Sequence, residues 1–442
     1  MLIYLVGILS FCLIINYYIL GEDLIAPSFI VNASFLFSST LALFSQKSWG
    51  TSFHFNTLML ILSTLVVFWS GCWVSERVFA GEKTKSAVNQ NINCDMVLYQ
   101  TSSISFKLIL GVTSFIILMD ILAFYYMYKF SIDLGNNQGY LNIIATLRPL
   151  IESKKIELPQ FFNMLSIVPM VVSYFFLALY WGVAIVKGKY FTRLYYLFPI
   201  LFYIPFILLS TGRTEFLRVT TYSLLIIAVL IQKRFGYSSK VNFKILVYSF
   251  LLILIFSFCF FSAGHFTGKI ITNDRTPFII VAHYTGAQIP ALDVFLNTYM
   301  IPDDGFIGKS TLLPEYRALR ALGVNLPQTS MFLEFVKYNT VDTNIYTPIR
   351  RYIQDYGYSG MLMAYFLIGL IYTYAYNFIK YRSDNLIYLV LYAFCSIPLF
   401  MLAHDEILLT NLVSLGNIIR IIFFFLVYHI FLKILKGDAY VG

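Results

Sequence analysis

Residues 106–128 read FKLILGVTSFIILMDILAFYYMY, an apolar run that contains two charged residues, Lys107 and Asp120. A helix of about 20 apolar residues crosses the hydrocarbon core of a bilayer, which is about 30 Å thick. Because the hydrocarbon offers no water, the backbone groups of a spanning segment must pair within that segment, as they do in a helix. This stretch therefore predicts a transmembrane helix.

Comparable runs recur from one end of the chain to the other. The 442 residues are 59% hydrophobic and 12% charged, whereas soluble proteins carry about 25% charged residues. We expect an all-α integral membrane protein with about eleven transmembrane helices and one large outer loop that contains short helices. The predicted spans are residues 2–20, 27–44, 54–73, 106–128, 161–186, 194–210, 218–231, 244–262, 359–379, 386–402 and 411–432.

The basic residues predict the orientation. The formal net charge is +9, and Lys and Arg gather in alternate short loops, as the positive-inside rule describes. This pattern places the C-terminus in the cytoplasm and, with an odd number of spans, the N-terminus outside. It also argues against nucleic-acid binding, because the basic residues form no continuous face.

The spans divide the chain into three parts: an N-terminal helix bundle (1–262), a large outer loop (263–358) and C-terminal helices (359–442). In the loop, ALDVFL (291–296) and LPEYRALRAL (313–322) have the apolar spacing of short helices that lie against the membrane. The sequence has no nucleotide-binding glycine pattern and no cysteine pair with zinc-ligand spacing. We therefore expect no cofactor and no metal.

The first candidate site is STGRTEFLR, residues 210–218, which joins two spans on the predicted outer side. Arg213 and Arg218 would lie at the membrane boundary, where a guanidinium can bind phosphate oxygens through two parallel hydrogen bonds. The alternative is structural: the arginines extend toward the headgroups from a helix end, with Glu215 paired to Arg218 three residues later.

The second candidate is RTPFIIVAHYTG, residues 275–286, in the outer loop. A histidine with a pKa near neutrality can remove the proton of an attacking hydroxyl, so His283 is a candidate base. Arg275 is a further candidate for anion binding and Tyr284 for glycan binding. The alternative is that His283 is an ordinary loop histidine packed by its neighbours.

The third candidate is IRRYIQDYGYSG, residues 349–360, directly before a predicted span. Arg350 and Arg351 approach the outer interface, against the positive-inside trend. In a helix Asp355 would lie four residues from Arg351 and could orient it. The alternative is interfacial anchoring of the span by arginine and tyrosine side chains.

Charged residues in or beside other spans are weaker candidates. Asp120 lies inside an apolar run, where an acid is costly and is often functional. Arg420 lies in the last apolar segment and either binds an anion or extends to the interface. The turn His404-Asp405-Glu406 could supply a carboxylate base or could simply be solvated.

This layout resembles the Wzy family of bacterial O-antigen polymerases, and its most specific parts are TGRT (211–214) and the stretch at residues 351–360. The resemblance implies a GT-C-like glycosyltransferase of the inner membrane whose large loop is periplasmic. It implies that units linked to undecaprenyl pyrophosphate are joined into O-antigen or capsular polysaccharide. The implied partners are these substrates, membrane lipid and a chain-length regulator protein.

The same resemblance implies roles for the candidate residues. The implied catalytic residues are His283, Arg213, Arg350 and Arg351. The implied substrate-binding residues are Arg218, Arg275, Tyr284, Asp355 and Arg420. Two other functions remain open: an O-antigen ligase shares the outer-loop layout, and a lipid-linked oligosaccharide flippase would have a similar length and charge but shorter outer loops.

Overall fold

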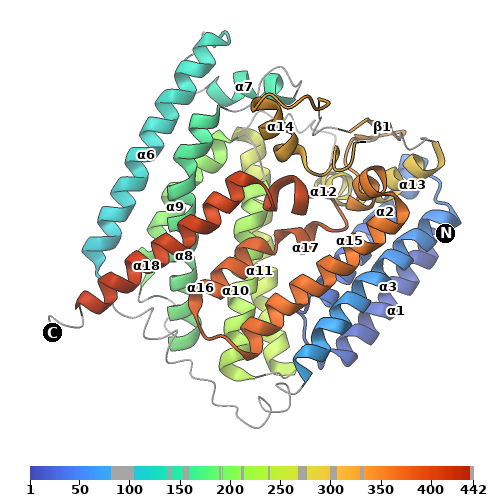
Figure 1. Ribbon diagram of the computed structural model, residues 1–442, viewed down its shortest axis with the longest axis horizontal. Helices are drawn as coiled ribbons and strands as arrows, with labels where there is room; N and C mark the ends of the chain where they lie inside the picture. Colours follow the sequence, from blue (N-terminus) through green and yellow to red (C-terminus); the bar gives the residue numbers. More distant parts are fainter. Residues whose placement is uncertain are drawn as a thin grey trace.

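The computed structural model describes residues 1–80, 104–136, 139, 142–152, 159–188, 191, 193–210, 214–236, 239–266, 276–298, 306–328 and 333–438. Figure 1 shows the bundle that these residues form. In chain order the elements are α1 (Leu2–Ile19), α2 (Pro27–Trp49), α3 (Phe55–Val78), α6 (Phe106–Asp133), α7 (Ile143–Glu152), α8 (Gln160–Lys187), η2 (Leu194–Leu197), α9 (Phe198–Leu209), α10 (Thr214–Phe235), α11 (Ser239–Phe266), α12 (Pro277–Gly286), α13 (Gln288–Thr298), α14 (Leu313–Ala321), β1 (Val336–Lys337), β2 (Asp342–Thr343), α15 (Pro348–Tyr381), α16 (Leu386–Cys395), α17 (Ile397–Met401), η3 (Leu408–Leu412) and α18 (Leu415–Asp438).

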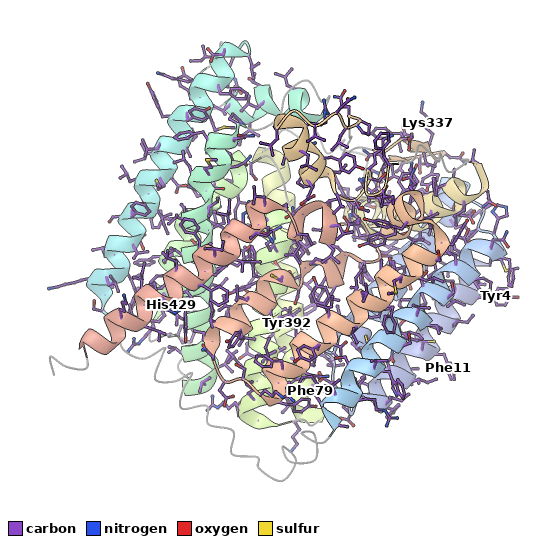
Figure 2. All side chains as sticks on the ribbon, viewed as in Figure 1. Tyr4, Phe11, Phe79, Lys337, Tyr392 and His429 are labelled. Carbon is purple, nitrogen blue, oxygen red and sulfur yellow. The ribbon has the colours of Figure 1, made fainter. Side chains whose placement is uncertain are left out.

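Nine helices among the described residues are long and apolar enough to cross a membrane. Two further predicted spans form shorter apolar helices, at 194–209 and 386–401. Figure 2 shows Tyr4 and Phe11 on the side of α1 that faces away from the bundle, and both are more than half exposed, as expected for side chains that lipid covers. The predicted all-α, multi-pass membrane architecture is confirmed. The total of eleven spans stays a prediction.

Helix α15 packs along α3, and two glycines allow the close approach. A Cβ atom added at Gly71 would lie 2.1 Å from the carbonyl oxygen of Phe366, and one added at Gly369 would lie 2.2 Å from that of Phe68. Small residues at the interface let membrane helices come together backbone to backbone. The α3–α15 pair forms one side of the bundle in Figure 1.

The helix α15 begins at Pro348, well before the predicted span start at residue 359. Gly357 interrupts it with φ +67° and ψ −176°, values that a residue with a side chain rarely adopts. Arg350, Arg351 and Asp355 therefore lie on the first turns of this helix, ahead of the break. The N-terminal turns carry the candidate side chains, and the remainder is the span.

We call the end of the bundle where α12, α13 and α14 lie the loop end. The two predicted loop helices are present as α13 and α14. Helix α13 packs against α2, α3 and α15. Its Asp293 is buried and accepts hydrogen bonds from the His54 amide and from Thr57 Oγ1, at 2.9 and 2.5 Å. Part of the outer loop is thus fixed to the bundle.

We call the opposite end, where α10 and α15 finish, the basic end. Asp23 is buried there and accepts hydrogen bonds from Lys380, Tyr376 and Gln232 at 2.5, 2.7 and 2.9 Å. Lys233 forms an ion pair with Asp384 at 3.0 Å. These contacts join the α1–α2 connection to α10, α15 and the start of α16.

Candidate functional site

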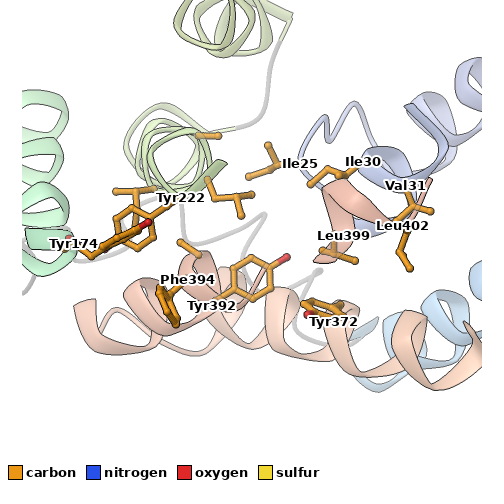
Figure 3. Packing of buried hydrophobic residues seen from close by; sticks show 14 of the residues in the cluster. Ile25, Ile30, Val31, Tyr174, Tyr222, Tyr372, Tyr392, Phe394, Leu399 and Leu402 are labelled. Carbon is orange, nitrogen blue, oxygen red and sulfur yellow. Dashed lines mark hydrogen bonds between the residues drawn. The ribbon is translucent and has the colours of Figure 1, made fainter. Parts of the chain in front are cut away.

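A buried arginine near the start of α10 anchors the first group of candidate residues. Arg218 Nη1 donates to Glu215 Oε2 over 2.9 Å, which is the pair that the structural alternative predicts. Tyr174 of α8 donates its hydroxyl to Glu215 Oε1 over 2.9 Å. The Arg218 guanidinium lies 5.5 Å from the Phe394 ring centroid, and Figure 3 shows Phe394 beside Tyr174 and Tyr222.

A second arginine, Arg420 of α18, is close enough for its charge to interact with that of Arg218. Its Nη1 lies 3.5 Å from Asn417 Oδ1, at the limit of a hydrogen bond. The Nε atoms of both arginines are buried and have no hydrogen-bond partner in the part of the chain that the structure describes. Like charges repel strongly in a medium of low dielectric constant, and an unpaired buried donor costs free energy. The pair therefore has spare donors and an excess of positive charge over the single carboxylate, Glu215.

Tyr203 of α9 completes this group. Its hydroxyl lies within electrostatic reach of Glu215, Arg218, Arg420 and Asp120 of α6. Asp120 has a buried Oδ1 atom with no hydrogen-bond partner among the described residues. We call Tyr174, Tyr203, Glu215, Arg218 and Arg420 the α10 site. The sequence alone did not indicate Tyr174 or Tyr203, because tyrosines are common in these spans and no spacing links them to Arg218.

The N-terminal turns of α15 form the second group. Arg350 is 1% exposed, and its Nη2 is hydrogen-bonded to Glu334 Oε2. The guanidinium lies 3.9 Å from the Tyr346 ring centroid and 4.5 Å from that of Phe295. Partial burial opposes ionisation of Glu334, but the hydrogen bond and charge of Arg350 outweigh it and lower the pKa of Glu334. Arg350 therefore binds the loop segment 333–347 to the bundle.

Arg351 and Asp355 both contact the loop segment 306–312. Arg351 Nη1 donates to the Ser310 carbonyl over 2.9 Å. Asp355 accepts from the amides of Ser310 and Thr311 at 2.9 and 2.7 Å, and from Thr311 Oγ1 at 2.6 Å. Asp355 thus orients this segment by direct hydrogen bonds, where the sequence predicted that it would orient Arg351. We call Arg350, Arg351 and Asp355 the α15 site.

The turn 404–406 lies beside the α15 site. Asp405 Oδ1 is 3.9 Å from Arg351 Nε, and Tyr352 donates to Glu406 Oε1 over 3.0 Å. Burial raises the pKa of Asp405 to about 6 and also raises the pKa of Glu406. Burial lowers the pKa of His404 to about 4, and the buried Nδ1 atom of this ring has no hydrogen-bond partner. His404 is therefore a neutral imidazole at pH 7 beside the α15 site.

His283 lies on α12, with its Nε2 atom 2.9 Å from the carbonyl oxygen of Asp342 in β2. Since a carbonyl only accepts, this bond requires a proton on Nε2 and ties the helix to the hairpin. The Tyr284 ring centroid lies 5.5 Å from that of His283. The contact fits a structural role, and the predicted role of His283 as a base stays a prediction.

Two further predicted residues, Arg213 and Arg275, lie outside the described residues. Three tyrosines of the loop, Tyr316, Tyr338 and Tyr346, each donate the hydroxyl to a backbone carbonyl of the loop or its helices. These hydroxyls stabilise the loop fold.

One segment of chain, residues 394–407, connects the two sites. Phe394 at its start contacts Arg218, and Asp405 near its end approaches Arg351. Between them, Ile397 and Met401 pack against Leu217 of α10, next to Arg218. The two sites are thus joined by one stretch of chain that includes α17.

No protein-family model, curated protein or solved structure matches this chain.

Proposed function

We propose that the protein is a membrane glycosyltransferase that polymerises oligosaccharide units linked to undecaprenyl pyrophosphate at the outer face of the bacterial inner membrane. The observation that carries this proposal is the pair Arg218 and Arg420, whose buried Nε atoms have no hydrogen-bond partner among the described residues. A guanidinium stays charged when buried and binds phosphate oxygens through parallel N–H donors. A pyrophosphate would supply both the missing acceptors and the missing negative charge.

The reaction gives each group of residues a task. A sugar hydroxyl of the acceptor attacks the anomeric carbon of the donor glycan and forms a new C–O bond. The bond between that carbon and the pyrophosphate oxygen breaks, and the lipid pyrophosphate leaves with the electron pair. Negative charge grows on the leaving oxygen, where preplaced guanidinium groups in a site of low dielectric constant stabilise it most.

The proton of the attacking hydroxyl passes to a base, and His404 is better suited to this task than His283. The His404 ring is neutral at pH 7 and has an unpartnered Nδ1, while His283 Nε2 is hydrogen-bonded to the hairpin. Arg350 and Arg351 already have carboxylate neighbours. In this proposal they hold the loop segments that receive the acceptor glycan.

The first test is a gel of surface polysaccharide from a strain that lacks the gene, beside its parent. Loss of the ladder of long chains, with a single capped repeat unit remaining, is the result expected for a polymerase. Loss of even the capped unit while polymer accumulates on its carrier would identify a ligase. Repeat units trapped on the cytoplasmic side would identify a flippase, and an unchanged ladder would refute all three.

The second test targets the α10 site with Arg420→Gln. This change removes a positive charge without leaving a carboxylate unpaired, because Arg218 keeps Glu215. We expect polymer to fall at least about 100-fold, the usual effect of deleting one charge-stabilising donor. Arg320→Gln on the exposed face of α14 is the matched control. Normal chain length in the Arg420 variant, at equal protein level, would remove the main support for the proposal.

A further inference from the structure

An apolar groove opens between α8, α10 and α11 at the basic end. It has a volume of about 320 Å³, and its walls include Ile185, Ile231, Phe235 and Val247. The share of liquid volume taken by one water is about 30 Å³, so the groove can hold a much larger group. The apolar side chains of its walls would contact the hydrocarbon part of a bound molecule.

Two cations flank the same aromatic ring at this groove. Lys244 Nζ lies 4.0 Å from the Phe235 ring centroid, and Arg234 Cζ lies 4.8 Å from it. Lys244 is exposed, and Arg234 also donates to the Ile185 carbonyl. Within the described part of the chain neither cation has a carboxylate partner, unlike the neighbouring Lys233, which is paired with Asp384.

The three helices that line the groove carry little negative charge. Residues 160–266, from the start of α8 to the end of α11, contain a single acid, Glu215, which lies at the loop end. The same residues contain four Lys or Arg in the stretch 233–244 alone. Asp23 of the α1–α2 connection reaches α10 at Gln232, but it is already paired with Lys380. Positive charge therefore predominates on the helices that line the groove, and basic pockets between membrane helices favour anionic lipid headgroups.

We propose that this groove binds one anionic phospholipid from the leaflet at the basic end, which the positive-inside rule assigns to the cytoplasm. An acyl chain lies along Ile231, Phe235 and Val247, and the headgroup phosphate is bound by Lys244 and Arg234. Phe235 contacts both the acyl chain and the headgroup, because it lines the groove and both cations lie close to its ring. The site is independent of the transferase reaction, which uses the opposite end of the bundle.

Native mass spectrometry of the full-length protein in a neutral detergent tests this site. With added phosphatidylglycerol we expect one tightly retained lipid, and with phosphatidylcholine none. Lys244→Gln should weaken retention about fivefold, the effect expected for one basic residue at an anionic lipid. Lys240→Gln, which removes an exposed charge from the same helix outside the groove, should leave retention unchanged.

A second variant, Val247→Trp, fills the groove without changing the charge. Val247 is 42% exposed, so the larger ring needs no buried neighbour to move. We expect this variant to lose the bound phosphatidylglycerol while keeping the unfolding midpoint of the detergent-purified parent. Equal retention by parent and both variants, equal retention of phosphatidylcholine, or preferential retention of a polyprenyl phosphate would each overturn the assignment.

Discussion

Buried charges lie at both ends of the helix bundle, and the two ends differ in how fully these charges are paired. At the basic end, Asp23 accepts hydrogen bonds from Lys380, Tyr376, Gln232 and the amide of Ile25. At the loop end, the α10 site has two arginines and one carboxylate, and within the described part of the chain both arginine Nε atoms have no hydrogen-bond partner. A network in which every buried polar group is hydrogen-bonded stabilises the fold. Buried donors without partners need an explanation, and the simplest one is that a bound ligand accepts their hydrogen bonds.

The difference also bears on the choice between polymerase and flippase. A flippase must open its cavity to both sides of the membrane in turn. Here the Asp23 network and the Lys233–Asp384 pair join α10, α15 and the α1–α2 connection at the basic end. Opening that end would separate buried charges, which is costly. A basic end held closed by these contacts favours the proposed transferase.

The largest expected effect is at the basic end. Asp23→Ala leaves Lys380, which is 11% exposed, without its buried partner. We expect a loss of about 3–5 kcal/mol in unfolding free energy. The double variant Asp23→Ala/Lys380→Met should recover most of this loss, because both buried charges are then gone. Unfolding of the detergent-solubilised protein measures both, and a single variant as stable as the parent would mean that the network is not structural.

The opposite pattern is expected at the loop end. Arg420→Gln should change the unfolding free energy by less than about 1 kcal/mol, because it breaks no carboxylate pair and relieves repulsion with Arg218. Polymer synthesis should fall at least about 100-fold in the same protein. A loss of stability as large as that of Asp23→Ala would show that the two ends do not differ as described.

The pH dependence of transfer sharpens the assignment of the base. A base acts only when unprotonated, and the pKa of His404 is lowered to about 4 by burial. The rate of the purified enzyme should therefore stay level from pH 8 to about 5 and fall as the pH approaches 4. A midpoint near 6.5, the ordinary value for histidine, would point to an exposed histidine instead. His404→Gln should abolish the reaction, and His429→Gln on α18 is the control.

The smallest effect is expected at Asp120. Its Oδ1 atom is buried without a partner, so replacing the carboxylate by a neutral amide removes a desolvation cost. Asp120→Asn should raise the unfolding free energy by about 1 kcal/mol, whereas Asp133→Asn on the exposed end of α6 should have no effect. A destabilised Asp120→Asn protein would show that the carboxylate has a structural partner.

The helices were largely predictable because hydropathy is a local property. Each apolar run, such as residues 106–128, forms a helix wherever it is placed, since the membrane forces its backbone groups to pair internally. The predicted first residue of a helix is wrong where tertiary contacts extend the helix. Residues 348–356 are polar enough that hydropathy predicts a loop. They are helical because Arg350, Arg351 and Asp355 bind the loop segments 333–347 and 306–312.

The sequence by itself determined that this is a multi-pass helical membrane protein with arginines at one end, because composition and spacing act within a segment. Only the tertiary structure decided which charges meet. Asp23 and Lys380 are separated by 357 positions, and the whole predicted outer loop, residues 263–358, lies between Arg218 and Arg420 in the sequence. Such contacts depend on how whole helices pack, and the spacing of residues within either helix does not predict them.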